Sequence, residues 1–151
     1  MIAVAQSDIA NPSAPSDCAA FKIRRLARRV TRIYDEALGP HGLTIGQFGI
    51  LGELRRRRGI GIATLAERLA VDASTLSRLF RPLAASGLLT VLPDPDDRRA
   101  KQLWLTDDGA ERVHAALPGW REAQARVTAH LGAARLAALR FTLDDAYQHL
   151  I

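Results

Sequence analysis

Between Asp72 and Leu83 the chain interleaves two stripes of side chains, and this pattern constrains the fold more than any other in the sequence. Both stripes repeat at the three- and four-residue spacing of an α-helix. The apolar stripe is Leu76, Leu79, Phe80 and Leu83, and the polar stripe is Ser74, Ser77, Arg78 and Arg81. Asp72 is a suitable N-cap, because its carboxylate can accept hydrogen bonds from the free amides of the first turn. The segment therefore predicts a short helix with one buried face and one polar face.

The polar face suits a helix that enters the major groove of DNA. Arginine can bridge O6 and N7 of guanine, and the hydroxyl groups of serine and threonine can bond to base edges or phosphates. The candidate DNA contacts on this helix are Ser74, Thr75, Ser77, Arg78 and Arg81. An ordinary surface helix would show a similar pattern, so the flanking segments have to decide between the two interpretations.

The segments around this helix predict a helix-turn-helix. A short helix at about 63–70 and a tight turn at Val71 and Asp72 precede it. Pro82 predicts a kink or an early end, because proline lacks an amide and collides with the carbonyl four residues back. Gly87 is expected to cap the helix at its C-terminus.

A hairpin is expected directly after the helix-turn-helix. Its strands are predicted at 88–92 and 101–106, and the tip between them, 93–100, is rich in turn-forming and charged residues. A charged hairpin in this position is a wing. Asp94, Asp96 and Asp97 in its tip are interpreted as turn residues rather than metal ligands, with Asp97 holding Arg99 by a charge-assisted hydrogen bond.

The rest of the chain predicts a mainly α (α+β) fold. Thr44 and Gln47 form a capping box, with Leu43 and Phe48 as its hydrophobic staple. The capping box should start a helix at 45–57, and Ile60 to Ile62 could add a short strand. Further helices are expected at 17–38, 107–117, 120–130 and 133–150, with breaks at Pro118–Gly119 and near Gly132.

Composition and the absence of catalytic patterns narrow the function. The net charge is +5 and the pI about 10.3, which makes an anionic partner such as DNA, RNA or a membrane surface possible. One cysteine allows no internal disulfide, and neither a signal peptide nor a membrane span is recognisable, so a cytoplasmic protein is expected. The four histidines are scattered, and no nucleophile elbow or phosphate loop is present. We expect neither an enzyme nor a metal site.

Several motifs together resemble the MarR family of winged-helix transcriptional regulators. The strongest is Asp97-Arg98-Arg99-Ala100-Lys101 followed by Leu105-Thr106-Asp107-Asp108-Gly109. Weaker matches are Gly42 to Phe48, Leu65 to Leu69, Ser74 to Arg78 and Gly87 to Leu89, and the resemblance covers about 18–150. Ala73 departs from the family pattern, where many members carry arginine, so the sequence preference on DNA stays open.

The resemblance implies a homodimer that binds an operator of double-stranded DNA. It implies a flexible arm at 1–16 and one domain at 17–151, in which 17–42 and 118–151 are dimerisation helices and 44–110 the winged helix-turn-helix. It also assigns the minor groove to Arg99, with Asp97 bracing it, while Arg98 and Lys101 would contact phosphates.

The family further implies that a small aromatic or phenolic effector controls DNA binding. Tyr34, His41, Phe48 and Trp104 are candidates to line its pocket, although each could be an ordinary core residue. No other cofactor is expected. Cys18 could alternatively make the protein a thiol-based redox sensor, because a helix start and a nearby lysine can lower a thiol pKa; a small buried thiol is the simpler interpretation. A basic protein that binds RNA or a membrane surface is the remaining alternative.

Overall fold

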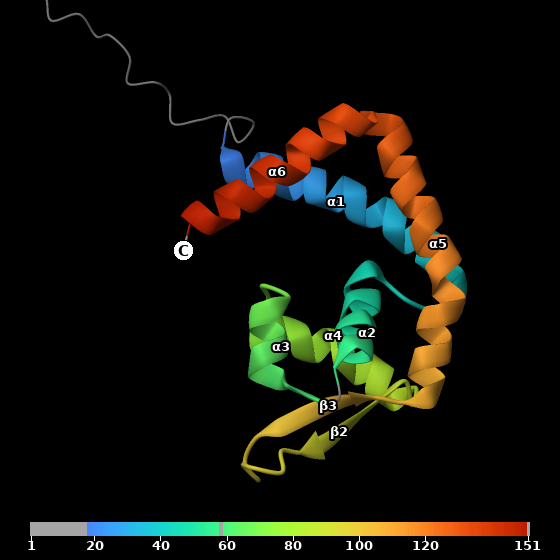
Figure 1. The fold of residues 1–151 in the computed structure, drawn as a ribbon, viewed down its shortest axis with the longest axis vertical. Helices are drawn as coiled ribbons and strands as arrows, with labels where there is room; N and C mark the ends of the chain where they lie inside the picture. The colour runs from blue at the N-terminus through green and yellow to red at the C-terminus, as the bar shows by residue number, and fades with distance from the viewer. Residues whose placement is uncertain (1–17, 58, 151) are drawn as a thin grey trace, which may run out of the picture. The chain divides into compact units, whose positions relative to one another are not determined.

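The structure, a computed structural model, describes residues 18–57 and 59–150 (Figure 1). The chain divides into two compact units after Arg32. The first unit contributes most of helix α1 (Ala19–Leu38), and the second contains the end of α1 and every other element. The predicted arm at 1–16 lies outside the described residues.

A complete capping box starts helix α2 (Ile45–Arg56), as the sequence predicts. Thr44 Oγ1 accepts a hydrogen bond from the Gln47 amide at 3.3 Å, and Gln47 Oε1 accepts one from the Thr44 amide at 3.1 Å. The Ile45 amide also donates to Asp35 Oδ1 at 2.8 Å. The last turns of α1 are therefore tied to the first turn of α2.

The predicted helix-turn-helix is present. Strand β1 (Ile60–Gly61) leads into α3 (Ile62–Arg68), and α4 (Ala73–Ala85) follows after a short turn. The expected early end at Pro82 is wrong, because α4 continues for three more residues. Pro82 and Arg78, whose carbonyl loses its amide partner, are both exposed residues, so water can replace the missing hydrogen bond. The helix ends with Gly87 at φ +74°, where the Leu88 amide donates to the Leu83 carbonyl at 2.9 Å.

A three-stranded antiparallel sheet carries the hairpin. Strands β2 (Leu89–Pro93) and β3 (Lys101–Leu105) pair with Val91 opposite Leu103, and β1 lies on the other side of β3. Helices α2, α3 and α4 gather against this sheet (Figure 1). The hairpin tip projects beyond the paired strands.

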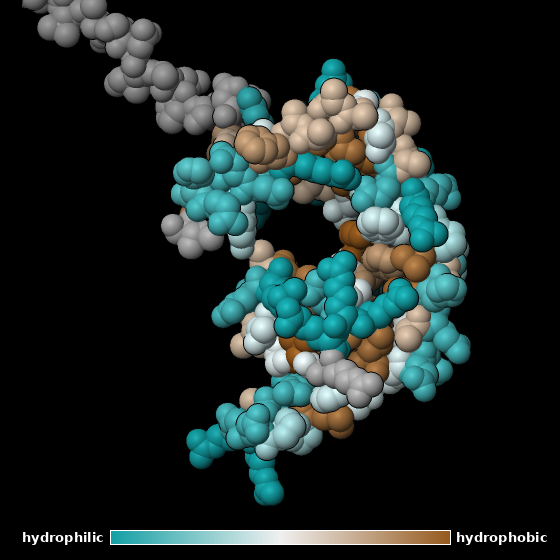
Figure 2. Space-filling model, in the orientation of Figure 1, coloured by the Kyte–Doolittle hydropathy of each residue, from teal (hydrophilic) through white to brown (hydrophobic). Residues whose placement is uncertain are grey.

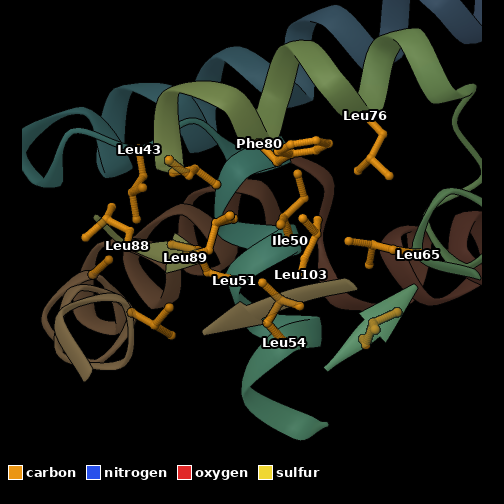
Figure 3. Packing of buried hydrophobic residues seen from close by; sticks show 14 of the residues in the cluster. Leu43, Ile50, Leu51, Leu54, Leu65, Leu76, Phe80, Leu88, Leu89 and Leu103 are labelled. Atoms are coloured by element: carbon orange, nitrogen blue, oxygen red, sulfur yellow. The ribbon is translucent and has the colours of Figure 1, made fainter. Parts of the chain in front are cut away.

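One apolar core joins the three helices to the sheet (Figure 3). Among its members, each at most 7% exposed, are Ile50 and Leu51 from α2, Leu65 from α3, Leu76 and Phe80 from α4, Leu89 from β2 and Leu103 from β3. Burying one leucine side chain stabilises the fold by about 1.5–3 kcal/mol. The apolar stripe of the 72–83 segment therefore fixes which face of α4 remains outside.

Helix α5 (Asp107–Leu131) runs without interruption, so the predicted break at Pro118–Gly119 is wrong. Buried residues recur at helical spacing on both sides of Pro118: Val113, Ala116, Gly119, Ala123 and Val127. Pro118 itself is exposed. Gly119 lies against the Ala37 carbonyl oxygen, which would be 2.6 Å from an added Cβ. Packing along this stripe outweighs the one hydrogen bond that proline removes.

Helix α6 (Ala133–His149) follows at Gly132, where a break was predicted. Leu136 is its one buried residue, while Phe141, Leu143 and Tyr147 are between 45% and 74% exposed. None of the helices in the described ranges is both long and apolar enough to cross a membrane.

Candidate DNA-binding site

The N-terminus of α4 is organised by Asp72. Its Oδ1 accepts hydrogen bonds from the Ser74 hydroxyl and the Thr75 amide, both at 2.7 Å, and its Oδ2 accepts from the Thr75 hydroxyl at 3.0 Å. The Ser74 hydrogen bond, followed by those of Thr75, lowers the pKa of Asp72 from 3.8 to about 2. The predicted N-cap is confirmed.

This network extends to the arginine at the centre of the polar face. Arg78 Nη2 donates to Thr75 Oγ1 at 3.2 Å, so the guanidinium is held by a hydroxyl that Asp72 already orients. The protons of the Ser74 and Thr75 hydroxyls point to Asp72. Each hydroxyl therefore has only acceptor lone pairs left, one of which Thr75 already uses for Arg78. Such acceptors suit amino groups on base edges better than phosphate oxygens.

The polar stripe predicted on α4 lies outside the core. Ser74, Arg78 and Arg81 are exposed, while Thr75 and Ser77 are half-buried. On the opposite face Leu76 is fully buried, and Leu79 packs against the core beside Gly46. The structure thus brings all five candidate residues of the helix onto one surface.

The hairpin tip is held by a carboxylate that the sequence reasoning had assigned only to turn chemistry. Asp94 Oδ1 accepts from the Asp96 amide and its Oδ2 from Gln102 Nε2, both at 2.9 Å. The Asp94 amide donates to the Ala100 carbonyl at 3.0 Å. These bonds, that of the Asp96 amide first, lower the pKa of Asp94. An aspartate before a proline in a hairpin tip is the available sequence signal for such a turn.

The side chain of Asp97 holds the backbone amide of Arg99, not the Arg99 guanidinium. Asp97 Oδ1 accepts from the Arg99 amide at 2.9 Å, and the Ala100 amide donates to the Asp97 carbonyl at 2.9 Å. The side chains of Arg98, Arg99 and Lys101 are exposed at this end of the molecule. Figure 2 shows that end, at lower left, mostly in hydrophilic colours. A braced backbone with exposed cations presents positive charge to a polyanion.

Thr106 fixes the wing to the end of α4. Its hydroxyl donates to the Gly87 carbonyl at 2.6 Å and accepts from the Gly109 amide at 3.0 Å, so one side chain caps α5 and holds the turn after α4. The Thr106 amide donates to the Leu88 carbonyl at 3.3 Å. These hydrogen bonds therefore fix the end of strand β3 in the wing to the turn that follows the polar-faced helix α4.

The four effector-pocket candidates do not gather in one place. Phe48 stacks on Trp120 with ring centroids 6.3 Å apart, and the His41 carbonyl accepts from Arg112 Nη1 at 2.9 Å. Burial raises the pKa of the half-buried Tyr34. Trp104 instead lines a separate hollow that includes none of the other three. Trp120 was not recognised from the sequence.

The remaining points concern the single cysteine and metal binding. Cys18 is a free, half-buried thiol at the start of α1, where its carbonyl accepts from the Lys22 amide at 3.1 Å. Within 18–57 and 59–150, the search for three or more grouped metal-ligating side chains finds none.

A helix-turn-helix with a polar outer face, joined rigidly to a basic wing, defines the protein as a winged-helix DNA-binding regulator. The MarR family model matches residues 43–101. The multiple antibiotic resistance protein MarR of Salmonella typhimurium is 32% identical over 115 residues, which cover 74% of this chain and 78% of that protein. The chain belongs to the MarR family.

Solved structures agree with this assignment. The Mycobacterium tuberculosis transcriptional regulator MosR in complex with DNA matches with a TM-score of 0.75 and 34% identity, covering 89% of this chain and 98% of that one. Bordetella bronchiseptica BpsR, whose DNA binding is regulated by 6-hydroxynicotinic acid, matches with a TM-score of 0.79 and 26% identity, covering 90% and 97%. Such relatives are transcriptional regulators and not enzymes, and the partner of this chain is operator DNA.

Proposed function

We propose that this regulator is a homodimeric, ligand-responsive repressor that binds a pseudo-palindromic operator in the cytoplasm. Each protomer would place α4 in one major groove, with the two reading helices about 34 Å apart, one turn of DNA. The observation that carries the DNA-reading part is the chain of hydrogen bonds from Asp72 through Thr75 to Arg78, which orders the contact surface before DNA arrives.

Within the wing we assign Arg99 to the minor groove and Arg98 and Lys101 to phosphates. Arg98 and Arg99 are the two central residues of the turn that is closed by the hydrogen bond from the Ala100 amide to the Asp97 carbonyl, and we assign them to different partners. The Arg99 amide is the one that Asp97 holds. A narrow, A·T-rich minor groove concentrates negative potential and attracts a guanidinium placed there.

A salt titration of two variants tests this assignment. Arg99→Ala should weaken specific binding severely and reduce the preference for A·T-rich flanks. Arg98→Ala should weaken specific and non-specific binding alike and lower the salt slope by about one unit. Operators with A·T or G·C flanks provide the comparison. If Arg98→Ala lost the flank preference and Arg99→Ala kept it, the two roles would be exchanged.

The dimer is supported by apolar side chains that the single chain leaves exposed. On α6, Phe141 is 74% and Tyr147 54% exposed. On α1, described by itself, Phe21 and Ile23 are 54% and 55% exposed. Burying such surfaces between two copies would gain about 25 cal/mol per Å² of apolar area, and half-sites need two readers.

Charge placed on α6 tests the dimer. Phe141→Asp should shift the protein toward monomer in light scattering coupled to size exclusion, and should weaken operator binding. Leu92→Asp is the matched control for the oligomeric state alone, because Leu92 is also an exposed apolar residue (44%) but lies on β2 of the wing. A Phe141→Asp protein that stayed dimeric at the wild-type concentration would remove α6 from the interface.

The proposed effector is a small aromatic or phenolic acid that lowers operator affinity, so that its arrival relieves repression. Its support is the stacked pair of Phe48 and Trp120. A second support is the half-buried phenol of Tyr34, whose pKa the Arg140 guanidinium lowers partly against the effect of burial. BpsR offers a relative whose DNA binding responds to such an acid. A ligand acts this way only by binding the two states unequally.

A thermal-shift screen of aromatic acids and their thioesters, followed by operator competition, tests this proposal. An effector should both raise the melting temperature and release DNA, and Phe48→Ala should abolish the two responses together. A reporter gene behind the operator then separates repression from activation. An acid that stabilises the protein without changing operator affinity would count against control by that acid.

A further inference from the structure

A hollow on the winged-helix lobe lies between the end of α2 and the start of α5, and we call it the α2–α5 hollow. Its volume is about 430 Å³, within the roughly 300–1,000 Å³ of small-molecule sites. Leu54, Trp104, Leu105 and Ala110 form its apolar part, and Arg55–Arg57 and Asp107 form its charged part. It shares no lining residue with the Phe48–Trp120 surroundings proposed for the effector.

The aromatic wall of the hollow is held in place. Trp104 lies in β3 opposite Thr90 of β2, and its ring packs on Gly59. A Cβ added at Gly59 would lie 2.5 Å from two ring carbons, and Gly59 has φ +72°, so only glycine fits beneath the indole. Leu54 is buried at 2% exposure, so the accessible apolar surface beside the ring comes from the half-buried Leu105 and Ala110. The hollow therefore offers a preformed slot for a flat, apolar group.

The rim carries more positive than negative charge. Glu53 pairs with Arg68 at 2.8 Å and only loosely with Arg56 at 3.7 Å. For Arg55 and Arg57 no carboxylate oxygen lies within 4.0 Å among the described residues. Asp107 opposes the three arginines, although it stands at the N-terminus of α5, where the helix dipole favours negative charge. The net local charge favours an anion on the arginine side.

We propose that the α2–α5 hollow is a second ligand site, which binds a small aromatic carboxylate. The ring would lie on Trp104, beside Leu105 and Ala110. The carboxylate would accept paired hydrogen bonds from Arg55 or Arg57. Operator phosphates are the competing partner of the arginines, but the indole of Trp104 in the same hollow suits a flat organic acid better than a duplex backbone. The proposal holds whether or not the effector site exists, because the hollow is lined by none of the residues proposed for the effector and the charge variants change only the hollow.

Trp104 emission supplies the measurement. The chain has two tryptophans, so Trp120→Phe leaves Trp104 as the only one. The probe is 4-nitrobenzoate, whose nitro group quenches indole, and uncharged 4-nitrobenzamide is its control. We expect saturable quenching by the acid and a clearly weaker response to the amide. Equal quenching by both compounds would overturn the anion site.

Charge variants then locate the carboxylate. Arg57→Gln, or Arg55→Gln as the second variant, should weaken 4-nitrobenzoate binding about fivefold, the upper range for an exposed ion pair. Asp107→Asn should tighten it about twofold, because a repulsive charge is removed. Arg121→Gln, on the exposed face of α5 away from the hollow, should leave the dissociation constant unchanged. Thermal melts establish that each variant is folded.

Two further results would overturn the proposal. One is wild-type binding of the acid by both arginine variants, since the carboxylate would then have no partner in the hollow. The other is a lack of saturation combined with an operator salt slope that falls by about one unit in Arg57→Gln. That combination would assign the arginines to DNA phosphates.

Discussion

Gly109 joins the wing to α5, and its replacement by alanine should be strongly destabilising. Gly109 is buried in the first turn of α5, and its amide donates to the Thr106 hydroxyl. A Cβ added there would overlap the carbonyl oxygen of Leu88 and lie 2.7 Å from Leu105 Cδ1. The carbonyl belongs to the backbone just before β2, so it cannot rotate away as a flexible side chain would.

The size of the effect follows from that geometry. Overpacking in a tight core costs about 1–3 kcal/mol, and a backbone obstacle places Gly109→Ala near the upper end. Gly52→Ala in α2 is the matched control, because nothing lies within 4 Å of its added Cβ. Alanine in a helix is about 0.5–1 kcal/mol more stabilising than glycine, and this gain applies to both variants, so it cancels in their comparison. The two variants should therefore differ by about 3 kcal/mol.

Urea unfolding and thermal melts at one fixed protein concentration provide the assay, because a dimer's stability depends on concentration. For a chain of this length about 3 kcal/mol corresponds to a separation of about 10 °C in Tm. Gly52→Ala should melt at or slightly above the wild type. If Gly109→Ala unfolded at the wild-type midpoint, the close approach to Leu88 would not be a constraint on the fold.

Four other expectations concern DNA binding, stability in acid and the hairpin tip. Arg78→Ala should cost about 1–3 kcal/mol in operator binding and relax preference at one position per half-site, and normal binding in a competition assay would contradict this. The pKa of Asp72 is lowered from 3.8 to about 2 in the folded protein, so the ionised carboxylate stabilises the fold above pH 3.8, and this stabilisation is lost as the pH falls toward 2. The difference in free energy of unfolding between wild type and Asp72→Asn should therefore disappear between pH 3.8 and pH 2. Gln102→Leu should loosen the bracing of Asp94 and speed hydrogen exchange of the hairpin-tip amides, and unchanged exchange would show that the backbone bonds suffice. Cys18→Ser should leave operator binding unchanged, whereas release of wild type but not of the variant by peroxide would favour the redox-sensor alternative.

Elements whose signals are local could be predicted from the sequence. The Thr44–Gln47 capping box, the Asp72 cap and the stripe of α4 each depend on residues a few positions apart, and all are present. The early end expected at Pro82 and the break expected at Pro118 were wrong for the opposite reason. A proline's local cost is readable, but the packing that outweighs it, such as Gly119 against Ala37, joins residues far apart in the sequence.

Contacts of the functional surface were harder to foresee. The sequence indicates that Asp97 braces Arg99, but only the backbone conformation shows that the amide is the partner. The Asp94–Gln102 bond depends on the hairpin register, which places residues eight apart side by side. The Phe48–Trp120 stack needs the relative positions of α2 and α5. The sequence thus indicated which residues take part in the functional surface, whereas their hydrogen-bonding and stacking partners could be identified only from the fold.

Because α5 is unbroken, the number of residues between two of its contacts fixes the angle between those contacts around the helix axis. Gly109 meets Leu88 near one end, and Gly119 meets Ala37 ten residues later on the same rod. Each residue of an α-helix turns the chain by about 100° and advances it by about 1.5 Å. One residue inserted between the two glycines would swing one contact to another side of the helix. Seven would nearly restore the angle yet lengthen the rod by about 10 Å, so this stretch tolerates substitutions far better than insertions.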